Sequence, residues 1–252
     1  MPRVSVVIPC YNHGVYLDEA VASVLDQTFP DFQILVVNDG STDPATCELL
    51  SDYCRPRTRV IHTANRGVAA ARNLGISEAV GEYILPLDAD DRIGPSYIEQ
   101  AVAVLDRQPE VGIVYSCVEL FGEASGEWKL PEFSLPHQLL DNQIFSAAVY
   151  RREAWRQVEG YSARMRHGWE DWDFWLRLLG QGKMPFQLEE TLFYYRIRKG
   201  SRDRSIGLLT KVYLMTRLLL EHRRLYWEHA GELVCILIDV GRRRPAAIKV
   251  NA

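Results

Sequence analysis

Short apolar runs alternate with segments of helical periodicity through the first 120 residues, and this alternation limits the chain to few folds. Residues 4–8 and 34–37 are rich in Val, Ile and Leu and are followed by Pro, Asn, Asp or Gly, which is typical of strands buried on both faces. Residues 17–25, between them, carry apolar side chains at helical spacing. Because parallel strands are joined by helical crossovers, the pattern predicts an α/β fold with a mainly parallel sheet flanked by helices.

The alternation continues beyond the second strand. Asp43 and Pro44 have the chemistry of an N-cap and a first helical turn, so they predict where the second helix begins. The pattern predicts further strands at residues 59–61, 82–87 and 111–118, and further helices at residues 68–79 and 95–107.

After about residue 120 the alternation loosens. Residues 122–136 have the composition of a loop, residues 171–180 predict a helix with Trp and Leu on one face, and residues 192–197 predict a strand. Residues 208–240 are rich in Leu, Arg and aromatic residues at helical spacing and predict two helices. Since no Gly/Ser-rich linker interrupts the chain, we expect one domain with a C-terminal helical extension.

The composition excludes several classes of protein. Of the 252 residues, 47% are hydrophobic and 25% are charged, which excludes disordered and collagen-like chains. No apolar stretch approaches the roughly 20 residues of a membrane-spanning helix, and no signal peptide is expected. The five cysteines show no CxxC spacing. We therefore expect reduced thiols in a cytoplasmic protein, rather than a disulfide framework or a zinc ribbon.

The net charge of −4 is unevenly distributed. From residue 196 onward, 13 Lys and Arg stand against 5 Asp and Glu, whereas the preceding residues carry 16 against 28. No nucleic-acid partner is expected, because a nucleic-acid reader usually carries its basic face on the folded module itself. Two interpretations of the basic end stay open. One is reversible docking to the inner face of an anionic membrane through Arg223, Arg224 and the arginines at 242–244; the other is packing against the domain with the arginines solvated.

Polar residues gather where the predicted strands end. In an open parallel sheet, ligands bind beyond the carboxyl ends of the strands, so these residues mark the expected site. The sequence has no GxGxxG after the first strand, no GxxxxGK[ST], no HExxH and no GxSxG, so the main support for four other enzyme classes is missing. The segments at the strand ends are Pro9-Cys10-Tyr11-Asn12, Asn38-Asp39-Gly40-Ser41-Thr42-Asp43, Asn65-Arg66-Gly67 and Asp88-Ala89-Asp90-Asp91.

Three carboxylates within four residues follow the fourth strand, and they repel one another unless they share a cation. A hard divalent ion, held by one or two carboxylates and by phosphate oxygens of a substrate, would relieve the repulsion. The alternative is that Asp90 or Asp91 caps the next turn. Asp39 and Arg72 could close on the same crevice. A nucleotide needs such groups: an acceptor for a base N–H, a cation for the diphosphate, and a metal.

In their order along the chain, these segments resemble the motifs of the family 2 glycosyltransferases, which have the GT-A fold. The segment Ala71-Arg72-Asn73 belongs to the resemblance, and Gly168-Trp169-Glu170-Asp171-Trp172-Asp173 is similar to the acceptor-side ED motif of that family. The resemblance covers about residues 3 to 200. It implies transfer of a sugar from a nucleotide donor, usually with inversion and usually with Mn²⁺ or Mg²⁺. It also divides the chain into a nucleotide-sugar half (1–120), an acceptor half (121–204) and a helical tail (205–252).

The resemblance also implies a role for each matching residue. Asp88 would approach the ribose, Asp90 the metal, and Asp171 would be the general base, with Glu170 beside it. Trp169 could stack on a sugar face, and the acceptor would be a saccharide or a lipid-linked molecule. The nucleotide pocket would be lined by Pro9, Tyr11, Asn12, Asp39 and Arg72.

One position departs from the family pattern. Many relatives carry a histidine after the acceptor region, whereas this chain has Arg198 at the corresponding place. A guanidinium offers only donors and cannot bind a cation, but it can hold phosphate oxygens. We therefore expect Asp90 to be the only strong protein ligand of the metal, with diphosphate and water completing the shell, and Arg198 to neutralise the leaving diphosphate.

Two other functions remain as alternatives. A non-catalytic protein of the same fold could bind a nucleotide sugar within a glycan-assembly complex; intact Asp39, Asp90 and Asp171 argue against it. A sugar nucleotidyltransferase would need a Gly-rich, basic loop after the first strand, which residues 9–13 do not provide.

Overall fold

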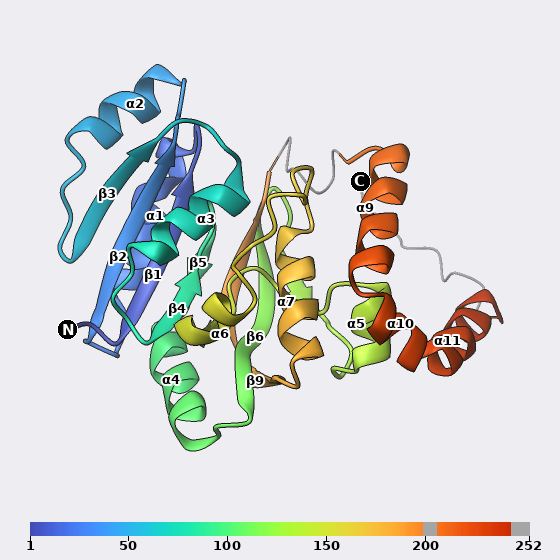
Figure 1. The fold of residues 1–252 in the computed structure, drawn as a ribbon. Helices are drawn as coiled ribbons and strands as arrows, with labels where there is room; N and C mark the ends of the chain where they lie inside the picture. Colours follow the sequence, from blue (N-terminus) through green and yellow to red (C-terminus); the bar gives the residue numbers. More distant parts are fainter. Residues whose placement is uncertain (199–205, 243–252) are drawn as a thin grey trace.

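The computed structural model describes residues 1–198 and 206–242, and the first part of the chain forms a parallel sheet (Figure 1). Four strands pair there in the order β3-β2-β1-β4. Val6 of β1 lies opposite Ile34 of β2 and Leu85 of β4 in the parallel register. The strands are β1 (Val4–Cys10), β2 (Phe32–Asp39), β3 (Thr58–Thr63) and β4 (Tyr83–Pro86).

Helices cover both faces of this sheet. The helices are α1 (Gly14–Leu25), α2 (Pro44–Ser51), α3 (Val68–Ser77) and α4 (Tyr97–Arg107). Val6 of β1 faces the core shared with α1 and α4, whereas Val7 faces the core shared with α3. The sequence prediction of strands buried on both faces is therefore confirmed. Asp43 caps α2 as predicted, because its carboxylate accepts the N–H of Thr46 at 2.8 Å.

The second part of the chain adds further strands, and most of its pairings are antiparallel. In the described residues the sheet continues from β4 in the order β8-β6-β9-β5, with β7 paired to β6. Among these pairs only β6 with β9 is parallel. The sheet is thus mixed, where the sequence predicted a mainly parallel one. The strands are β5 (Arg92–Ile93), β6 (Val111–Gly122), β7 (Gly126–Trp128), β8 (Val149–Arg151) and β9 (Met184–Ile197).

Helices of the second part pack on the same face of the sheet as α3. The helix α7 (Glu170–Gly180) buries Trp175 and Leu176 there, as its pattern of Trp and Leu predicted. Two short helices, α5 (Leu135–Leu140) and α6 (Arg152–Gln157), lie in regions where the sequence predicted no regular structure.

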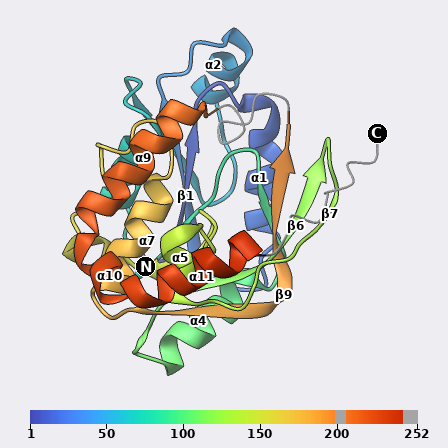
Figure 2. The ribbon, with the colours of Figure 1, turned by 90° about the vertical axis from the view of Figure 1, so that its right-hand side faces the viewer.

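In the described residues, the C-terminal extension forms three helices where the sequence predicted two. They are α9 (Leu208–Glu221), α10 (Arg223–Glu228) and α11 (Ala230–Arg242), and Figure 2 shows them together at one end of the molecule. His222 divides α9 from α10, and its ring Nε2–H donates to Asp173 of α7 at 3.0 Å. Tyr226 also donates to the carbonyl of Leu139. The extension is thereby tied to α7 and α5.

Part of the predicted basic tail lies outside the described residues. These are residues 243–252, which include the second and third arginines of the run at 242–244. Over the described ranges, no helix is both long and apolar enough to cross a membrane.

Candidate active site

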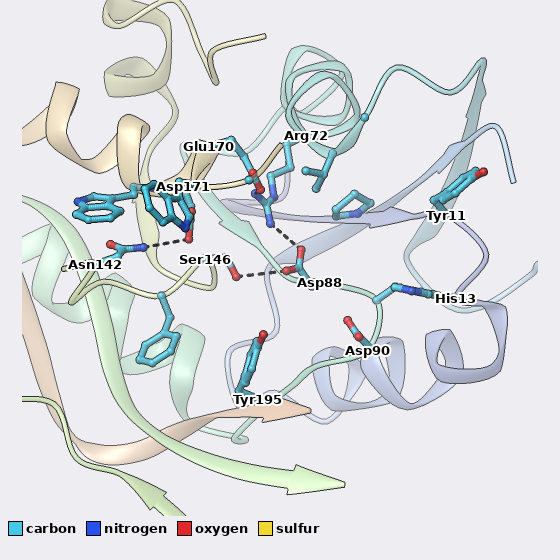
Figure 3. A pocket seen from close by; sticks show the side chains of 18 of the residues that line it. Tyr11, His13, Arg72, Asp88, Asp90, Asn142, Ser146, Glu170, Asp171 and Tyr195 are labelled. Atoms are coloured by element: carbon cyan, nitrogen blue, oxygen red, sulfur yellow. Dashed lines mark hydrogen bonds and ion pairs between the residues drawn. The ribbon is translucent and has the colours of Figure 1, made fainter. Parts of the chain in front are cut away.

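A cavity of about 670 Å³ opens at the carboxyl ends of β1, β2 and β4 and extends to the start of α7 (Figure 3). Its position agrees with the general rule for open α/β sheets. Nearly all of the site residues predicted from the sequence line it. They are Pro9, Tyr11, Asp39, Arg72, Asp88, Asp90, Trp169, Glu170, Asp171 and Arg198.

Asn12, the remaining predicted residue, is not among the cavity-lining residues. Its side-chain oxygen accepts the N–H groups of Thr42 and Asp43 at 2.7 and 2.9 Å. Its own backbone N–H donates to Ser41. Asn12 therefore ties the loop after β1 to the loop after β2 and fixes the shape of the cavity rim.

Asp39 ends β2 and is buried, with 3% of its surface exposed. Its two carboxylate oxygens accept the backbone N–H groups of Arg66 and Gly67, each at 2.9 Å. These bonds hold the loop that leads into α3. An ionised carboxylate has about four acceptor positions, so Asp39 can still accept from a ligand. Tyr11 lies across the cavity mouth with 42% of its surface exposed.

Arg72 is almost completely buried and lies between two carboxylates. It donates to Glu170 and to Asp88, both at 2.7 Å. Its guanidinium also lies over the aromatic ring of Tyr161. Burial alone would lower the pKa of Arg72, but the charges of Asp88 and Glu170 outweigh it and raise the pKa well above its ordinary value. In the structure the charge of Arg72 joins α3, the end of β4 and α7. Its contact with a diphosphate stays a prediction.

Asp171 differs from its neighbour Glu170 in its surroundings. Glu170 is 2% exposed and bound to Arg72, whereas Asp171 is only half-buried and faces the cavity (Figure 3). Asp171 accepts the N–H of Trp172 at 2.8 Å and a bond from the amide of Asn142 at 3.3 Å. Burial and the charge of Glu170 raise the pKa of Asp171 to about 6, against the opposing charge of Arg72. A carboxylate with this pKa is suited to accept a proton near neutral pH.

The turn before α7 has an unusual backbone. Trp169 has φ 59° in the left-handed region, directly after Gly168 with φ 130°. This conformation is costly for a bulky residue and tends to persist where function requires it. It places Glu170 and Asp171 in the first turn of α7, and the Trp169 ring contacts the Trp172 ring with centroids 5.1 Å apart.

Asp90 lies at the end of the cavity that Tyr11 and His13 share (Figure 3). Arg198, just after β9, donates from Nε to Asp90 at 2.6 Å and from Nη2 to the ring of His13 at 2.8 Å. Burial is the main cause that lowers the pKa of His13, so a neutral ring that accepts from Arg198 is favoured. The sequence analysis placed Arg198 near the metal and the diphosphate, and the structure adds that Arg198 pairs directly with Asp90.

Asp91 is buried away from the cavity, whereas Asp90 lines it. It is 1% exposed, and one of its oxygens accepts the backbone N–H of Arg196 at 2.8 Å. Burial first, and then the charges of Asp90 and Asp88, raise the pKa of Asp91 well above its ordinary value. Asp91 thus holds β9 against the loop that carries Asp90.

The carboxylates at this end of the cavity suit a hard divalent cation only if a bound substrate supplies most of the metal's other ligands. Asp88 is engaged by Arg72 and, at 3.5 Å, by the hydroxyl of Ser146. No cluster of three or more His, Cys, Asp or Glu with metal-site geometry occurs within the described ranges. Asp90 offers hard carboxylate oxygen beside these groups, and Mg²⁺ is commonly bound by one or two carboxylates together with substrate phosphates. The residues therefore fit a metal that binds with a diphosphate.

The structure adds site residues that the sequence analysis missed. Asn142 and Ser146 bond to Asp171 and Asp88, respectively. Phe145, Trp128 and Tyr195 form an aromatic wall, with the Trp128 ring 5.1 Å from Phe145 and 6.2 Å from Tyr195. These residues lie in a loop, a short strand and a long strand, where no motif marked them. His13 also lines the cavity, as do Ile206 and Lys211 beside or within α9.

The cavity thus has two ends of different chemistry. One end combines Tyr11, Asp39, Asp90 and Arg198, which can hold a base, a ribose and a diphosphate with a cation. The other end combines Asp171 with aromatic side chains, which can hold a hydroxyl-bearing molecule and accept its proton.

Comparison with known proteins agrees with this arrangement. Residues 5–169 match the model of glycosyl transferase family 2. The chain is 31% identical to EpsE of Bacillus subtilis over 209 residues, which cover 79% of this chain and 74% of EpsE. It is also 31% identical to a hyaluronan synthase of Pasteurella multocida over 220 residues, 84% of this chain but only 22% of that synthase.

The fold is shared with solved structures at lower identity. The structure of TarS residues 1–349 from S. aureus in complex with UDP-GlcNAc superimposes with a TM-score of 0.69 and 19% identity. The superposition covers 90% of this chain and 73% of that one. The GT-A fold predicted from the sequence is therefore confirmed.

Proposed function

Since the chain belongs to glycosyl transferase family 2, we propose that it transfers a sugar from a nucleotide sugar to an acceptor hydroxyl with inversion at the anomeric carbon. The observation that carries this proposal is the half-buried carboxylate of Asp171, which faces the cavity opposite the nucleotide end. Attack by a hydroxyl requires loss of its proton, and Asp171 would accept that proton as general base.

The surroundings of the other carboxylates support inversion. A retaining double displacement would need a carboxylate free to attack the anomeric carbon. Glu170 is buried against Arg72, and Asp88 is engaged by Arg72 and Ser146. Asp171 is proposed to act on the acceptor in a single displacement, and one displacement inverts the configuration.

The raised pKa of Asp171 leads to an expected pH dependence. The base works only when ionised, so kcat/KM should fall as the pH drops through about 6, the folded-state pKa. At pH 5 about one tenth of the value at pH 8 should remain. A profile of kcat/KM from pH 4.5 to 8.5 measures this. A kcat/KM that still keeps most of its pH 8 value at pH 5, as expected for an aspartate with an ordinary pKa of about 3.9, would contradict the role of Asp171.

The nucleotide is proposed to be a uridine diphosphate. Asp39 would accept the N3–H of uracil with the acceptor positions that Arg66 and Gly67 leave open, and Tyr11 would lie against the base. The TarS structure in complex with UDP-GlcNAc supports a UDP-sugar for this fold. Pro9 would line the same pocket, and Asp88 would approach the ribose.

The choice of base can be measured by calorimetry with UDP and CDP. Cytosine lacks the N3–H donor, so CDP would leave the buried Asp39 without its partner at a cost of about 1–3 kcal/mol. UDP should therefore bind about 5- to 150-fold more tightly than CDP. Equal affinity for the two nucleotides would contradict the assignment of Asp39.

Mn²⁺ or Mg²⁺ is proposed as the cofactor, held by Asp90 together with the diphosphate. When bound, such an ion stabilises the negative charge that grows on the leaving diphosphate. Arg198 is proposed to add a second positive charge, by donating to diphosphate oxygens from its place beside Asp90.

A site with one strong protein ligand has a measurable signature. Titration of Mn²⁺ by calorimetry should show weak binding to the protein alone, because Asp90 is paired with the Arg198 guanidinium, and at least about tenfold tighter binding with UDP present. The matched variant Asp90→Asn should lose most of this enhancement. Tight binding of Mn²⁺ without UDP would contradict the proposal.

The acceptor is proposed to be a saccharide or a lipid-linked molecule that binds at the aromatic wall and at Trp169. We also propose a cytoplasmic location, with peripheral contact to the inner face of a membrane through the basic C-terminal end.

A further inference from the structure

Helix α9 has apolar residues on two opposite sides. Leu214 and Leu218 are fully buried against the core that also holds α7. The opposite side forms a stripe, which we call the outer stripe. The apolar residues of this stripe each have between 42% and 86% of their surface exposed. Thr216, a polar residue, is exposed on the same side of the helix. The outer stripe consists of Leu208, Leu209, Val212, Tyr213, Leu219 and Leu220.

The next two helices also expose apolar side chains. Trp227 of α10 is 83% exposed. In α11, Leu233 is buried, whereas Val234, Leu237 and Ile238 are exposed. Figure 2 shows all three helices on the same side of the molecule. Single exposed apolar residues are normal on a soluble protein, but an extended apolar surface marks a contact with a partner or a membrane.

The start of α9 also belongs to the cavity. Ile206 and Lys211 line it together with Asp171 and Trp169. One short segment therefore borders the end of the cavity where the acceptor would bind and also carries the outer stripe. Whatever covers the outer stripe lies close to the acceptor.

The charges around the stripe indicate which partner fits. Residues 206–242 contain five Lys and Arg against four Asp and Glu, and residues 243–252, which follow α11 in the sequence, add three more Lys and Arg and no acid. Lys211 and Arg223 are exposed and make no ion pair with the described residues, whereas Arg217 and Arg224 are paired. A second copy docked about a two-fold axis would bring two such basic ends together, and like charges oppose that contact. An anionic surface that also accepts apolar side chains is complementary.

We propose that the outer stripe, with Trp227 and the exposed side of α11, seats the protein on an anionic lipid bilayer. The helices would lie in the interface with apolar side chains toward the acyl region, while cations meet the headgroups. The apolar stripe then supplies most of the anchoring. The consequence for the acceptor rests on the proposed function: a lipid-linked acceptor would reach Asp171 without leaving the membrane surface.

Sedimentation with vesicles tests the proposal on the full chain. The vesicles are phosphatidylcholine alone, and phosphatidylcholine mixed with phosphatidylglycerol. The test variant is Leu209→Asp with Leu220→Asp, and the matched control is Val15→Asp, an exposed apolar residue of α1 at 83% against 86% for Leu209. We expect the wild type and the control to sediment with the anionic vesicles, and the test variant to lose at least about tenfold in partitioning.

Three results would overturn the proposal. The first is a wild type that stays in the supernatant with anionic vesicles, and the second is a test variant that sediments as the wild type does. The third is a wild-type dimer in light scattering that the same double substitution dissociates, because a second copy would then cover the stripe. Thermal unfolding checks that both variants fold. UDP binding, measured separately, tests the proposed function. A failure of membrane docking can therefore be distinguished from a failure of the proposed function.

Discussion

Replacing Asp171 with asparagine is expected to lower kcat by about 10²–10⁴-fold, the usual contribution of a general base. The amide keeps the shape of the side chain and can still accept the N–H of Trp172, so the start of α7 should not move. Donor affinity should be unchanged, because Asp171 lies at the acceptor end of the cavity. Steady-state kinetics with a nucleotide sugar that the wild type uses as donor measures kcat, and calorimetry with UDP measures the affinity of the donor site.

Glu170→Gln is the comparison variant for this experiment. Glu170 is adjacent in sequence, but its carboxylate is buried against Arg72, so its substitution should act on stability rather than on proton transfer. Both variants must be assayed at a temperature at which thermal unfolding shows them folded. If folded Glu170→Gln loses more turnover than Asp171→Asn, the base has been assigned to the wrong carboxylate.

Arg72→Met is expected to destabilise the protein by about 3–5 kcal/mol, because it leaves Glu170 and Asp88 without their shared cation. That is a large part of the 5–15 kcal/mol that ordinarily holds a domain folded. For a chain of this size Tm should fall by roughly 6–20 °C. Differential scanning calorimetry measures the shift.

Two companion variants separate charge from packing. Arg72→Lys keeps the positive charge but cannot donate to two carboxylates in the same geometry, so it should give an intermediate loss. Arg72→Met combined with Glu170→Gln removes the uncompensated carboxylate, so it should cost less than the sum of the two single changes. A loss below about 1 kcal/mol for Arg72→Met, or strict additivity in the double variant, would show that the buried ion pairs do not hold the site together.

The long elements of the fold were predictable because their residues face buried layers. β1 and β2 each contain a run of buried apolar residues, and α4 and α7 have one apolar side, so their patterns are unambiguous. β5, β7 and β8 have only two or three residues each, which is too short for a period to show. Their antiparallel pairing makes the sheet mixed, and no local sequence pattern predicts this pairing.

The sequence predicted which residues line the site, but not which of them pair with one another. The motifs at the strand ends and before α7 gave nearly every cavity-lining carboxylate, because parallel strands bring their carboxyl ends to one edge. Glu170, one of the two partners of Arg72, lies 98 residues away, and Arg198 lies 108 residues from Asp90. Such pairs depend on how α7 and β9 pack, so only the structure could show that Arg72 is neutralised inside the protein.

The sequence patterns also could not distinguish Glu170 from Asp171 on physical grounds. Both are acids in the first turn of a helix, where the helix dipole favours either. The resemblance to the family selected Asp171. The structure adds the physical reason, since the buried guanidinium of Arg72 engages Glu170 and leaves Asp171 toward the cavity.

The central claim is that this chain catalyses sugar transfer from a UDP-sugar, rather than only binding one. The most direct measurement is the release of UDP from a panel of UDP-sugars in the presence of Mn²⁺, followed by chromatography for the wild type and for Asp171→Asn. We predict that the wild type releases UDP from at least one donor, at a rate about 10²-fold or more above the variant, while both bind UDP equally well. A wild type that binds UDP but releases it from no donor faster than Asp171→Asn would contradict the claim and indicate a non-catalytic nucleotide-sugar-binding protein.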